Sequence, residues 1–214
     1  MDTKAKILCS IPNLIGYFRF VSAIAACYYA IDKPSYFVVC YMVSYGCDAI
    51  DGWAARKFNQ STEFGAVLDM VLDRFSTTLL LATLSILYAE YRFAFMIFVA
   101  LDFISHWLQM YSTLRGGEAH HKNATTNYSI ISFYYRKSVL FTTCLSAELF
   151  GLFFYIQYFN YRLLAKEYHP LISYGVYLSA PLFFFKQVVN VFQIVSSAEK
   201  LAELDLPGYK NKKN

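Results

Sequence analysis

Apolar residues dominate this chain in six long segments that are separated by short polar breaks. The segments cover residues 13–31, 35–56, 62–88, 93–115, 135–159 and 170–199. They are long, rich in aromatic residues and free of the apolar–polar alternation of a half-buried strand, so the pattern predicts helices. A short segment with two lysines precedes the first of them. We therefore expect an all-α polytopic membrane protein, with six transmembrane helices after a short N-terminal amphipathic segment.

Composition supports a membrane protein. The 214 residues are 57% hydrophobic and only 16% charged, whereas about a quarter of the residues in a soluble domain are charged. The five cysteines have no CxxC spacing, so we expect small buried side chains in place of a disulfide framework or a zinc site. The net charge of +4 is modest and sits at segment ends, which favours anionic lipid headgroups over nucleic acid as the partner.

Lysine and arginine predict how the chain is oriented. If the N-terminus, the turn at 57–61, the loop at 115–135 and the tail share one side, that side carries twelve basic residues and the other carries four. Basic residues accumulate on the cytosolic side of membrane proteins. We therefore expect both termini in the cytosol, a membrane domain over residues 1–200 and a basic cytosolic tail over 201–214.

Four aspartates lie at the predicted cytosolic ends of the second and third segments. Asp48 and Asp51 are three residues apart and Asp69 and Asp73 are four apart, so each pair occupies one helical face. Unpaired carboxylates in hydrocarbon cost about 2.5–3.5 kcal/mol each, and neighbouring ones repel each other. The three nearby arginines neutralise only part of this charge. The carboxylate oxygens are hard ligands, so the four aspartates predict a site for one or two Mg²⁺ or Mn²⁺ ions. The alternative to a metal site is a helix crossing held by salt bridges.

Residues beside the aspartates indicate what such a metal does. Glycine weakens a helix, so Gly52 and Gly65 predict a groove in which a ligand approaches the backbone. Arg56 follows Gly52 by one helical turn and is placed to contact a phosphate. Metal, arginine and a glycine-lined groove together are typical of phosphoryl transfer. A carboxylate that is not needed for tight metal binding can take a proton from an attacking hydroxyl.

The stretch from Asp48 to Asp73 fits without mismatch the pattern D-x2-D-G-x2-A-R-x8-G-x3-D-x3-D. This chain thereby resembles the CDP-alcohol phosphatidyltransferase family. Other stretches resemble the eukaryotic branch of that family that makes phosphatidylinositol, namely PNLIGYFR, RKFNQSTEFGAVLDM, LDFISHWLQM, RGGEAHHK and AELF. The resemblance covers nearly the whole chain.

The resemblance implies a role for each matched position. Two divalent metals, Mg²⁺ or Mn²⁺, would be held at the diphosphate of a CDP-lipid by Asp48, Asp51, Asp69 and Asp73. Asp73 would also act as the base that deprotonates the acceptor alcohol. The CDP-diacylglycerol site would be lined by Gly52, Arg56, Thr62 and Gly65, and Asn13 and Arg19 would approach the diphosphate.

The resemblance also implies the reaction and its place. CDP-diacylglycerol and myo-inositol would give phosphatidylinositol and CMP, in a cytosol-facing cavity of an enzyme of the endoplasmic reticulum membrane. A homodimer is implied as well, because related bacterial enzymes are dimers.

Polar residues outside the motif are candidates for binding the acceptor. Asp102 and His106 form an i, i+4 pair, which serves either inositol or helix packing. Further candidates are Arg115, His120, His121 and Lys122, for which a solvated loop is the alternative. Glu148 is expected to face the bundle and pair with a polar neighbour, and Lys186 lies inside the last segment, where it contacts headgroups or anchors the helix.

Other functions remain open from the sequence. The motif does not name the acceptor, so glycerol 3-phosphate or serine is an alternative to inositol. A divalent-cation transporter would use the intramembrane carboxylates as a transit site, but it gives no role to Gly52, Arg56 and Gly65. A structural membrane scaffold leaves the aspartates unexplained.

Overall fold

The structure is a computed structural model that describes residues 3–116 and 128–206. Within these ranges it is helical, without strands, which confirms the all-α part of the predicted fold class. In chain order the elements are α1 (Thr3–Leu8), α2 (Ile11–Tyr29), α3 (Pro34–Lys57), α4 (Glu63–Leu87), η1 (Ala89–Tyr91), α5 (Arg92–Gly116), α6 (Ser129–Tyr134), α7 (Lys137–Tyr158), α8 (Asn160–Leu163), η3 (Lys166–Tyr168) and α9 (His169–Asp205).

The six predicted segments correspond to α2, α3, α4, α5, α7 and α9. Five of these, with η1 joined to α5 and η3 to α9, are long and apolar enough to cross a membrane. The exception is α3, which has 24 residues but includes Asp48, Asp51, Arg56 and Lys57. These charged side chains lower its average hydropathy, so six crossings are not confirmed. Helix α9 runs through Asp205, beyond the predicted start of the tail at residue 201.

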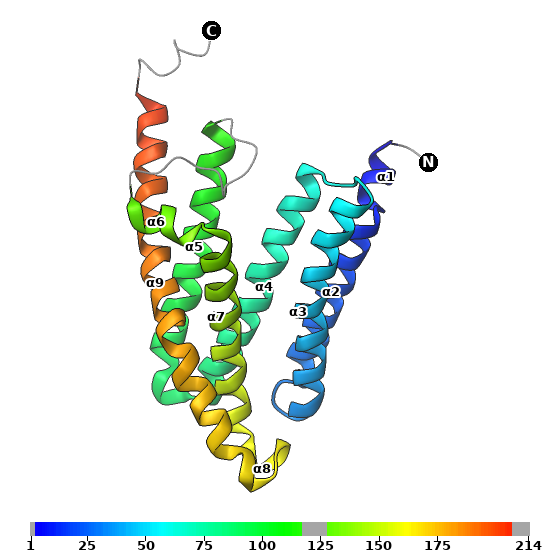
Figure 1. Cartoon of the computed structure of the whole chain (residues 1–214), viewed down its shortest axis with the longest axis vertical. Helices are drawn as coiled ribbons and strands as arrows, with labels where there is room; N and C mark the ends of the chain where they lie inside the picture. The colour runs from blue at the N-terminus through cyan, green and yellow to red at the C-terminus, as the bar shows by residue number, and fades with distance from the viewer. Residues whose placement is uncertain (1–2, 117–127, 207–214) are drawn as a thin grey trace.

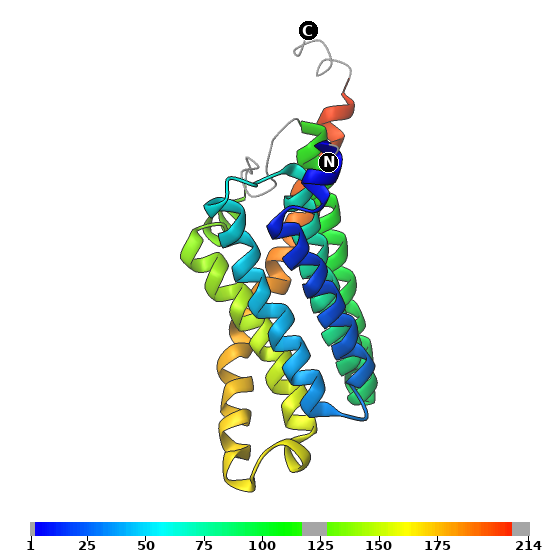
Figure 2. The same ribbon diagram turned by 90° about the vertical axis from the view of Figure 1, so that its right-hand side faces the viewer.

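The long helices form a bundle in which α2 and α3 pack as an antiparallel pair (Figures 1 and 2). Helix α4 contacts α2 on one side and α5 and α7 on the other, and α9 packs against α5 and α7. Contact between α3 and α4 is slight, although a short turn joins them. Helix α2 is therefore the element that connects α3 to the rest of the motif.

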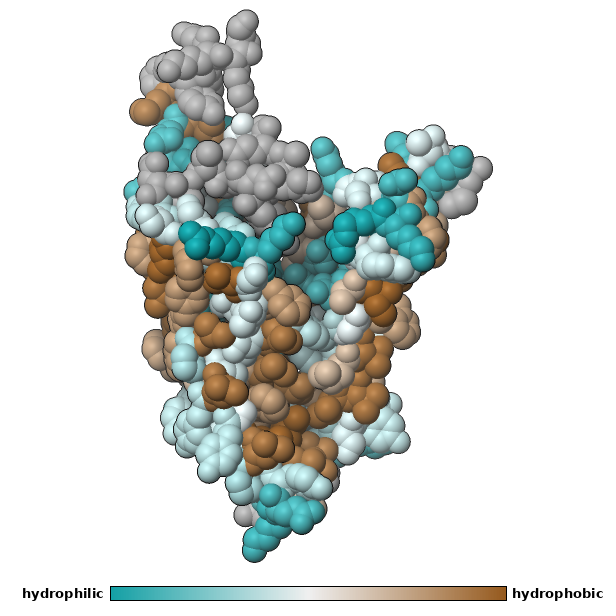
Figure 3. All heavy atoms as spheres, in the orientation of Figure 1, coloured by the Kyte–Doolittle hydropathy of each residue, from teal (hydrophilic) through white to brown (hydrophobic). Residues whose placement is uncertain are grey.

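Segments that we predicted to share a side lie at the same end of the bundle. Figure 1 shows α1, the α3–α4 turn, the end of α5 and the end of α9 together at the top. The α2–α3 turn, η1 and α8 lie toward the opposite end. Figure 3 shows hydrophilic residues at both ends and a broad hydrophobic band between them, as expected for a chain that crosses a bilayer.

The aromatic core fills the half of the bundle away from the α3–α4 turn. Phe37 and Tyr155 stack with their ring centroids 3.9 Å apart, and both are almost fully buried. The Tyr155 hydroxyl donates to the Ala30 carbonyl at 2.7 Å, which ties α7 to the end of α2. Leu80 and Leu84 of α4 complete this core. Since lipid is as apolar as these side chains, close packing and satisfied polar groups hold the helices together there.

Two glycines allow α7 to approach its neighbours closely. A Cβ atom added at Gly151 would lie 2.6 Å from Leu80 Cδ2, and one added at Gly175 would lie 2.8 Å from the ring of Phe153. Small residues at such contacts let helix backbones approach each other in membranes. Gly151 thus fixes the distance between α7 and α4, the helix that carries Asp69 and Asp73.

We expect Gly151→Ala to destabilise the bundle, because the added Cβ would overlap the side chain of Leu80, which is buried in the core. Overpacking of this kind costs about 1–3 kcal/mol, measurable as a lower unfolding temperature of the purified protein in detergent. Gly46→Ala is the matched control, since a Cβ there meets nothing within 4 Å. Equal unfolding temperatures for the two variants would contradict this account of the α4–α7 contact.

Candidate functional site

One arginine gathers all four predicted aspartates. The Arg19 guanidinium projects from α2 and is only 3% exposed. Its Nη1 donates to Asp51 Oδ2 at 2.7 Å and to Asp69 Oδ1 at 2.9 Å. Its Nη2 lies 2.8 Å from Asp48 Oδ1 and donates to Asp73 Oδ1 at 2.8 Å. The two helical faces predicted from the spacing therefore do meet, and they meet around a side chain of α2.

Three of these carboxylates are placed to share a metal ion. Asp48, Asp51 and Asp69 each offer an oxygen, and these oxygens lie within 4.8 Å of one another. Asp73 is not in that group, although it contacts the same guanidinium. A set of carboxylate oxygens suits a hard divalent cation such as Mg²⁺ or Mn²⁺. Because a single guanidinium faces four carboxylates, the donor set and its charge both fit such an ion.

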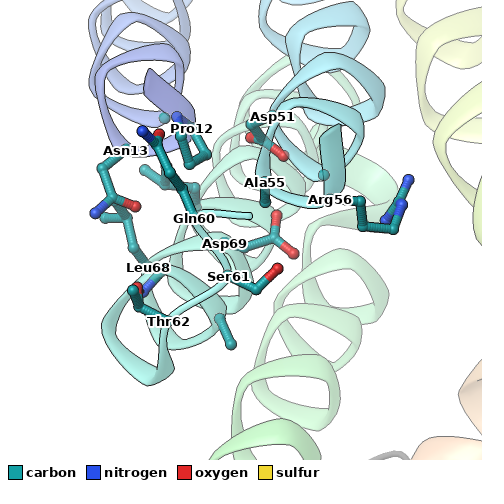
Figure 4. A pocket seen from close by; sticks show the side chains of 15 residues that line it. Pro12, Asn13, Asp51, Ala55, Arg56, Gln60, Ser61, Thr62, Leu68 and Asp69 are labelled. Atoms are coloured by element: carbon teal, nitrogen blue, oxygen red, sulfur yellow. The ribbon is translucent and has the colours of Figure 1, made fainter. Parts of the chain in front are cut away.

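A cavity of about 230 Å³, here called the turn cavity, opens beside the cluster toward the α3–α4 turn. Asp51 and Asp69 lie on its wall, and Figure 4 shows both pointing into the same space. It is lined by Pro12, Asn13, Gly16, Asp51, Gly52, Ala55, Arg56, Gln60, Ser61, Thr62, Gly65, Ala66, Leu68, Asp69 and Leu72. The structure therefore brings together in the lining of one cavity the four positions predicted for a nucleotide-lipid, Gly52, Arg56, Thr62 and Gly65.

Hydrogen bonds around the turn shape this cavity. Thr62 caps α4 by accepting from the Gly65 backbone N–H at 3.0 Å, as Thr commonly does at helix N-termini. Gln60 Oε1 accepts from the Ile11 N–H at 3.0 Å, which holds the start of α2 against the turn. A Cβ at Gly65 would lie 3.1 Å from both Asn13 Oδ1 and Thr62 Oγ1. Glycine at this position therefore keeps the wall of the cavity open.

Arg56 lies on the side of the turn cavity away from Asn13 and Thr62 (Figure 4). Its guanidinium folds back along α3, where a Cβ at Gly52 would lie 3.4 Å from Nη1. A guanidinium in this place can contact an anionic group that enters the cavity.

A second cavity, here called the bundle cavity, adjoins the cluster deeper among the helices. Asp48 and Asp73 line it, whereas Asp51 and Asp69 line the turn cavity, so the cluster stands between the two. Its walls come from α2, α3, α4, α7 and α9 and consist of Arg19, Tyr41, Tyr45, Asp48, Asp73, Arg74, Ser76, Cys144, Glu148 and Lys186. Sequence reasoning did not identify this cavity. The signal for it was the ionisable Glu148 and Lys186 inside apolar segments.

Glu148 faces the bundle, as the sequence predicted. Its carboxylate accepts hydrogen bonds from the Tyr41 hydroxyl and, at 2.7 Å, from the Thr77 hydroxyl. These bonds link α7 to α3 and α4 at the wall of the bundle cavity. The expectation that Glu148 pairs with a polar neighbour is confirmed.

Asp102 is the centre of a buried ionic network. Arg74 Nη1 donates to its two carboxylate oxygens at 2.7 and 2.8 Å, and Lys186 Nζ lies 3.2 Å from Oδ1. His106 Nδ1 lies 2.8 Å from the Asp102 backbone carbonyl. The network joins α4, α5 and α9. Of the two predicted roles for Asp102 and His106, helix packing is thus the one that the contacts favour.

The remaining acceptor candidates lie away from both cavities or outside the described residues. His106 lines an apolar groove between α4 and α5 together with Phe103 and Trp107. Arg115 is half exposed, with Nη2 3.9 Å from Asp205 Oδ1. His120, His121 and Lys122 lie outside the residues that the structure describes.

The chain is similar in sequence to a known protein family and to several named proteins. The family model for CDP-alcohol phosphatidyltransferases matches residues 9–195. A protein of Candida albicans named CDP-diacylglycerol–inositol 3-phosphatidyltransferase is 41% identical over 91% of this chain and 83% of its own length. Proteins of the same name from Homo sapiens and Saccharomyces cerevisiae are each 37% identical over 95% of this chain, and over 96% and 90% of their own lengths. No solved structure matches the chain.

We expect Arg19→Gln to lower the unfolding temperature of the protein in chelator, because four carboxylates then face one another without the guanidinium. Added Mg²⁺ or Mn²⁺ should raise the unfolding temperature of the variant more than that of the wild type, since the ion takes over the charge compensation. Arg115→Gln is the control, because it removes an exposed arginine. Equal metal-induced shifts in wild type and Arg19→Gln would contradict the proposed place of the metal.

Proposed function

The chain belongs to the CDP-alcohol phosphatidyltransferase family, and on that premise we propose that it transfers the phosphatidyl group of CDP-diacylglycerol to myo-inositol, giving phosphatidylinositol and CMP. The observation that carries the proposal is the agreement of full-length relatives in yeast, Candida and human, all named for this inositol reaction. The cluster of four aspartates between two cavities supplies what such a transfer needs. A metal transporter would leave the turn cavity and its glycines without a role.

Asp48, Asp51 and Asp69 would hold Mg²⁺ or Mn²⁺, and Asp73 would complete the site for a second ion. The metal supplies positive charge that offsets the diphosphate and the departing CMP. Arg19 adds positive charge from the protein itself, because its guanidinium contacts all four aspartates of the cluster. Its hydrogen bonds orient the carboxylates from within the bundle.

The CDP head would bind in the turn cavity. Gly65 and Gly52 allow a flat group to approach the helix backbones, and Arg56 can contact phosphate at the cavity edge. Asn13 Oδ1 lies beside Gly65 and is available to a donor of the nucleotide. The acyl chains would remain in the bilayer, alongside the apolar faces of the helices.

Asp73 would act as the base for the acceptor. It is the motif aspartate outside the metal-binding trio, and it lines the bundle cavity. In the proposed step an inositol hydroxyl oxygen attacks the β-phosphorus, its proton passes to the Asp73 carboxylate, and CMP leaves with the bonding electron pair. Because Asp73 belongs to the cluster and also lines the bundle cavity, it can take a proton from an alcohol in that cavity without a rearrangement of the cluster.

We further propose an endoplasmic reticulum location, with the α3–α4 turn and both termini in the cytosol. This orientation is supported by basic residues in segments that lie at that end of the bundle in Figure 1, namely Lys4 in α1, Lys57 at the end of α3, Arg136 before α7 and Lys200 near the end of α9. It makes α3 a sixth crossing, in which Asp48 and Asp51 are paired with Arg19 of α2. A homodimer remains a prediction from the resemblance.

Purified protein supplied with CDP-diacylglycerol, Mg²⁺ or Mn²⁺ and one alcohol at a time should release CMP with myo-inositol. It should not do so with serine or glycerol 3-phosphate, and EDTA should abolish the release. CMP release with one of the other alcohols but not with inositol would show that the acceptor is wrong. Metal flux into proteoliposomes without CMP release would instead favour a transporter.

We expect Asp73→Asn to reduce kcat by several orders of magnitude while CDP-diacylglycerol binding changes little, because the base is lost and only part of the metal shell is weakened, with Asp48, Asp51 and Asp69 kept. Equilibrium binding of labelled CDP-diacylglycerol and single-turnover CMP release measure the two effects. Asp205→Asn is the control, since Asp205 is exposed at the end of α9. Turnover like that of the wild type in Asp73→Asn would exclude this residue as the base.

A further inference from the structure

The bundle cavity has the chemistry of a site for an uncharged polyol. Its walls carry three cationic side chains, Arg19, Arg74 and Lys186, and three carboxylates, Asp48, Asp73 and Glu148. Tyr41, Tyr45 and Ser76 add hydroxyl groups. Resting on the function proposed above, we propose that Glu148 binds hydroxyls of the inositol ring in this cavity and so selects a neutral polyol as the acceptor.

Charge on the cavity wall disfavours an anionic acceptor. Cations and carboxylates are equal in number among the lining side chains. Behind the wall, Asp102 takes both Arg74 and Lys186 as ion partners at 2.7 and 3.2 Å. The positive charge is therefore already compensated, and a phosphate that entered would meet the Glu148 carboxylate at a cost in Coulomb energy. An uncharged ring meets no such penalty.

Glu148 has hydrogen-bonding capacity to spare. An ionised carboxylate offers about four lone-pair sites, and the protein donors to Glu148 are the hydroxyls of Tyr41 and Thr77, one on each oxygen. The remaining lone pairs can accept from two hydroxyls of a polyol. Myo-inositol has a hydroxyl on every ring carbon and can therefore donate several hydrogen bonds. The Glu148 carboxylate, which Tyr41 and Thr77 hold in place, is a charged hydrogen-bond acceptor suited to them.

The position of Asp73 connects this cavity to the reaction. Asp73 lines the bundle cavity and also touches the cluster through Arg19. A ring held by Glu148 would therefore lie between the carboxylate that binds it and the carboxylate that takes its proton. The CDP head in the turn cavity would reach the same point from the other side of the cluster.

Steady-state kinetics of Glu148→Gln test the proposal. We expect the KM for myo-inositol to rise roughly tenfold to a hundredfold, which corresponds to the loss of a hydrogen bond to a charged group, while the KM for CDP-diacylglycerol stays unchanged. Glycerol 3-phosphate should inhibit this variant more strongly than the wild type, because the repelling carboxylate is gone. A residue that only supports packing would not change the charge preference.

Two further variants guard against a folding defect. Cys144→Met adds bulk to the same cavity without changing its charge, so it should also raise the KM for inositol alone. Thr83→Val is the control, because the Thr83 hydroxyl bonds only the Leu79 carbonyl of its own helix and lies outside the cavity. It should leave both KM values unchanged. Unfolding temperatures of all three variants show whether the bundle is intact.

The outcomes separate this inference from the proposed function. If the wild type releases no CMP with inositol, the proposed function fails. If the wild type is active but Glu148→Gln and Cys144→Met both keep the wild-type KM for inositol, the acceptor binds elsewhere and this inference is overturned. Equal rises in the KM values for inositol and CDP-diacylglycerol would also overturn it, because they would indicate a general disturbance of the cluster.

Discussion

The convergence of four carboxylates on one buried guanidinium is the constraint on which the structure depends. Asp48 and Asp51 come from α3, Asp69 and Asp73 come from α4, and these two helices hardly contact each other. Arg19 of α2 reaches both pairs and so sets the distance between them. Such a charge cluster is costly in an apolar bundle, and Arg19 offsets part of that cost because it pairs with all four carboxylates.

The aromatic core and the polar cavities lie in different halves of the bundle. Aromatic side chains pack between α2, α3, α4 and α7 at the end near η1 and α8. Ionic and hydroxyl groups lie toward the α3–α4 turn, where both cavities open off the aspartate cluster. Gly151 lets α7 approach α4 at the boundary between the halves. The apolar half therefore holds together the helices that carry the carboxylates.

Much of the fold and part of the site were predictable from local patterns. Helical segments follow from long apolar runs, and the pairing of Asp48 with Asp51 and of Asp69 with Asp73 follows from helical periodicity. The acceptor side was not predictable in this way. Asp102 and His106 share a helical face and looked suitable for inositol, yet Asp102 is occupied by Arg74 and Lys186 from two other helices. Periodicity says nothing about partners on distant elements.

The sequence by itself determined the motif, the helical class and the residues with metal-binding chemistry, because these depend on composition and on spacing within single helices. Only the tertiary structure decided which side chains meet. It placed Arg19 among the aspartates, divided them between two cavities and brought Glu148 of α7 and Lys186 of α9 to the same wall. These contacts join residues far apart in the chain, and the packing of five helices, not any local rule, sets their distances.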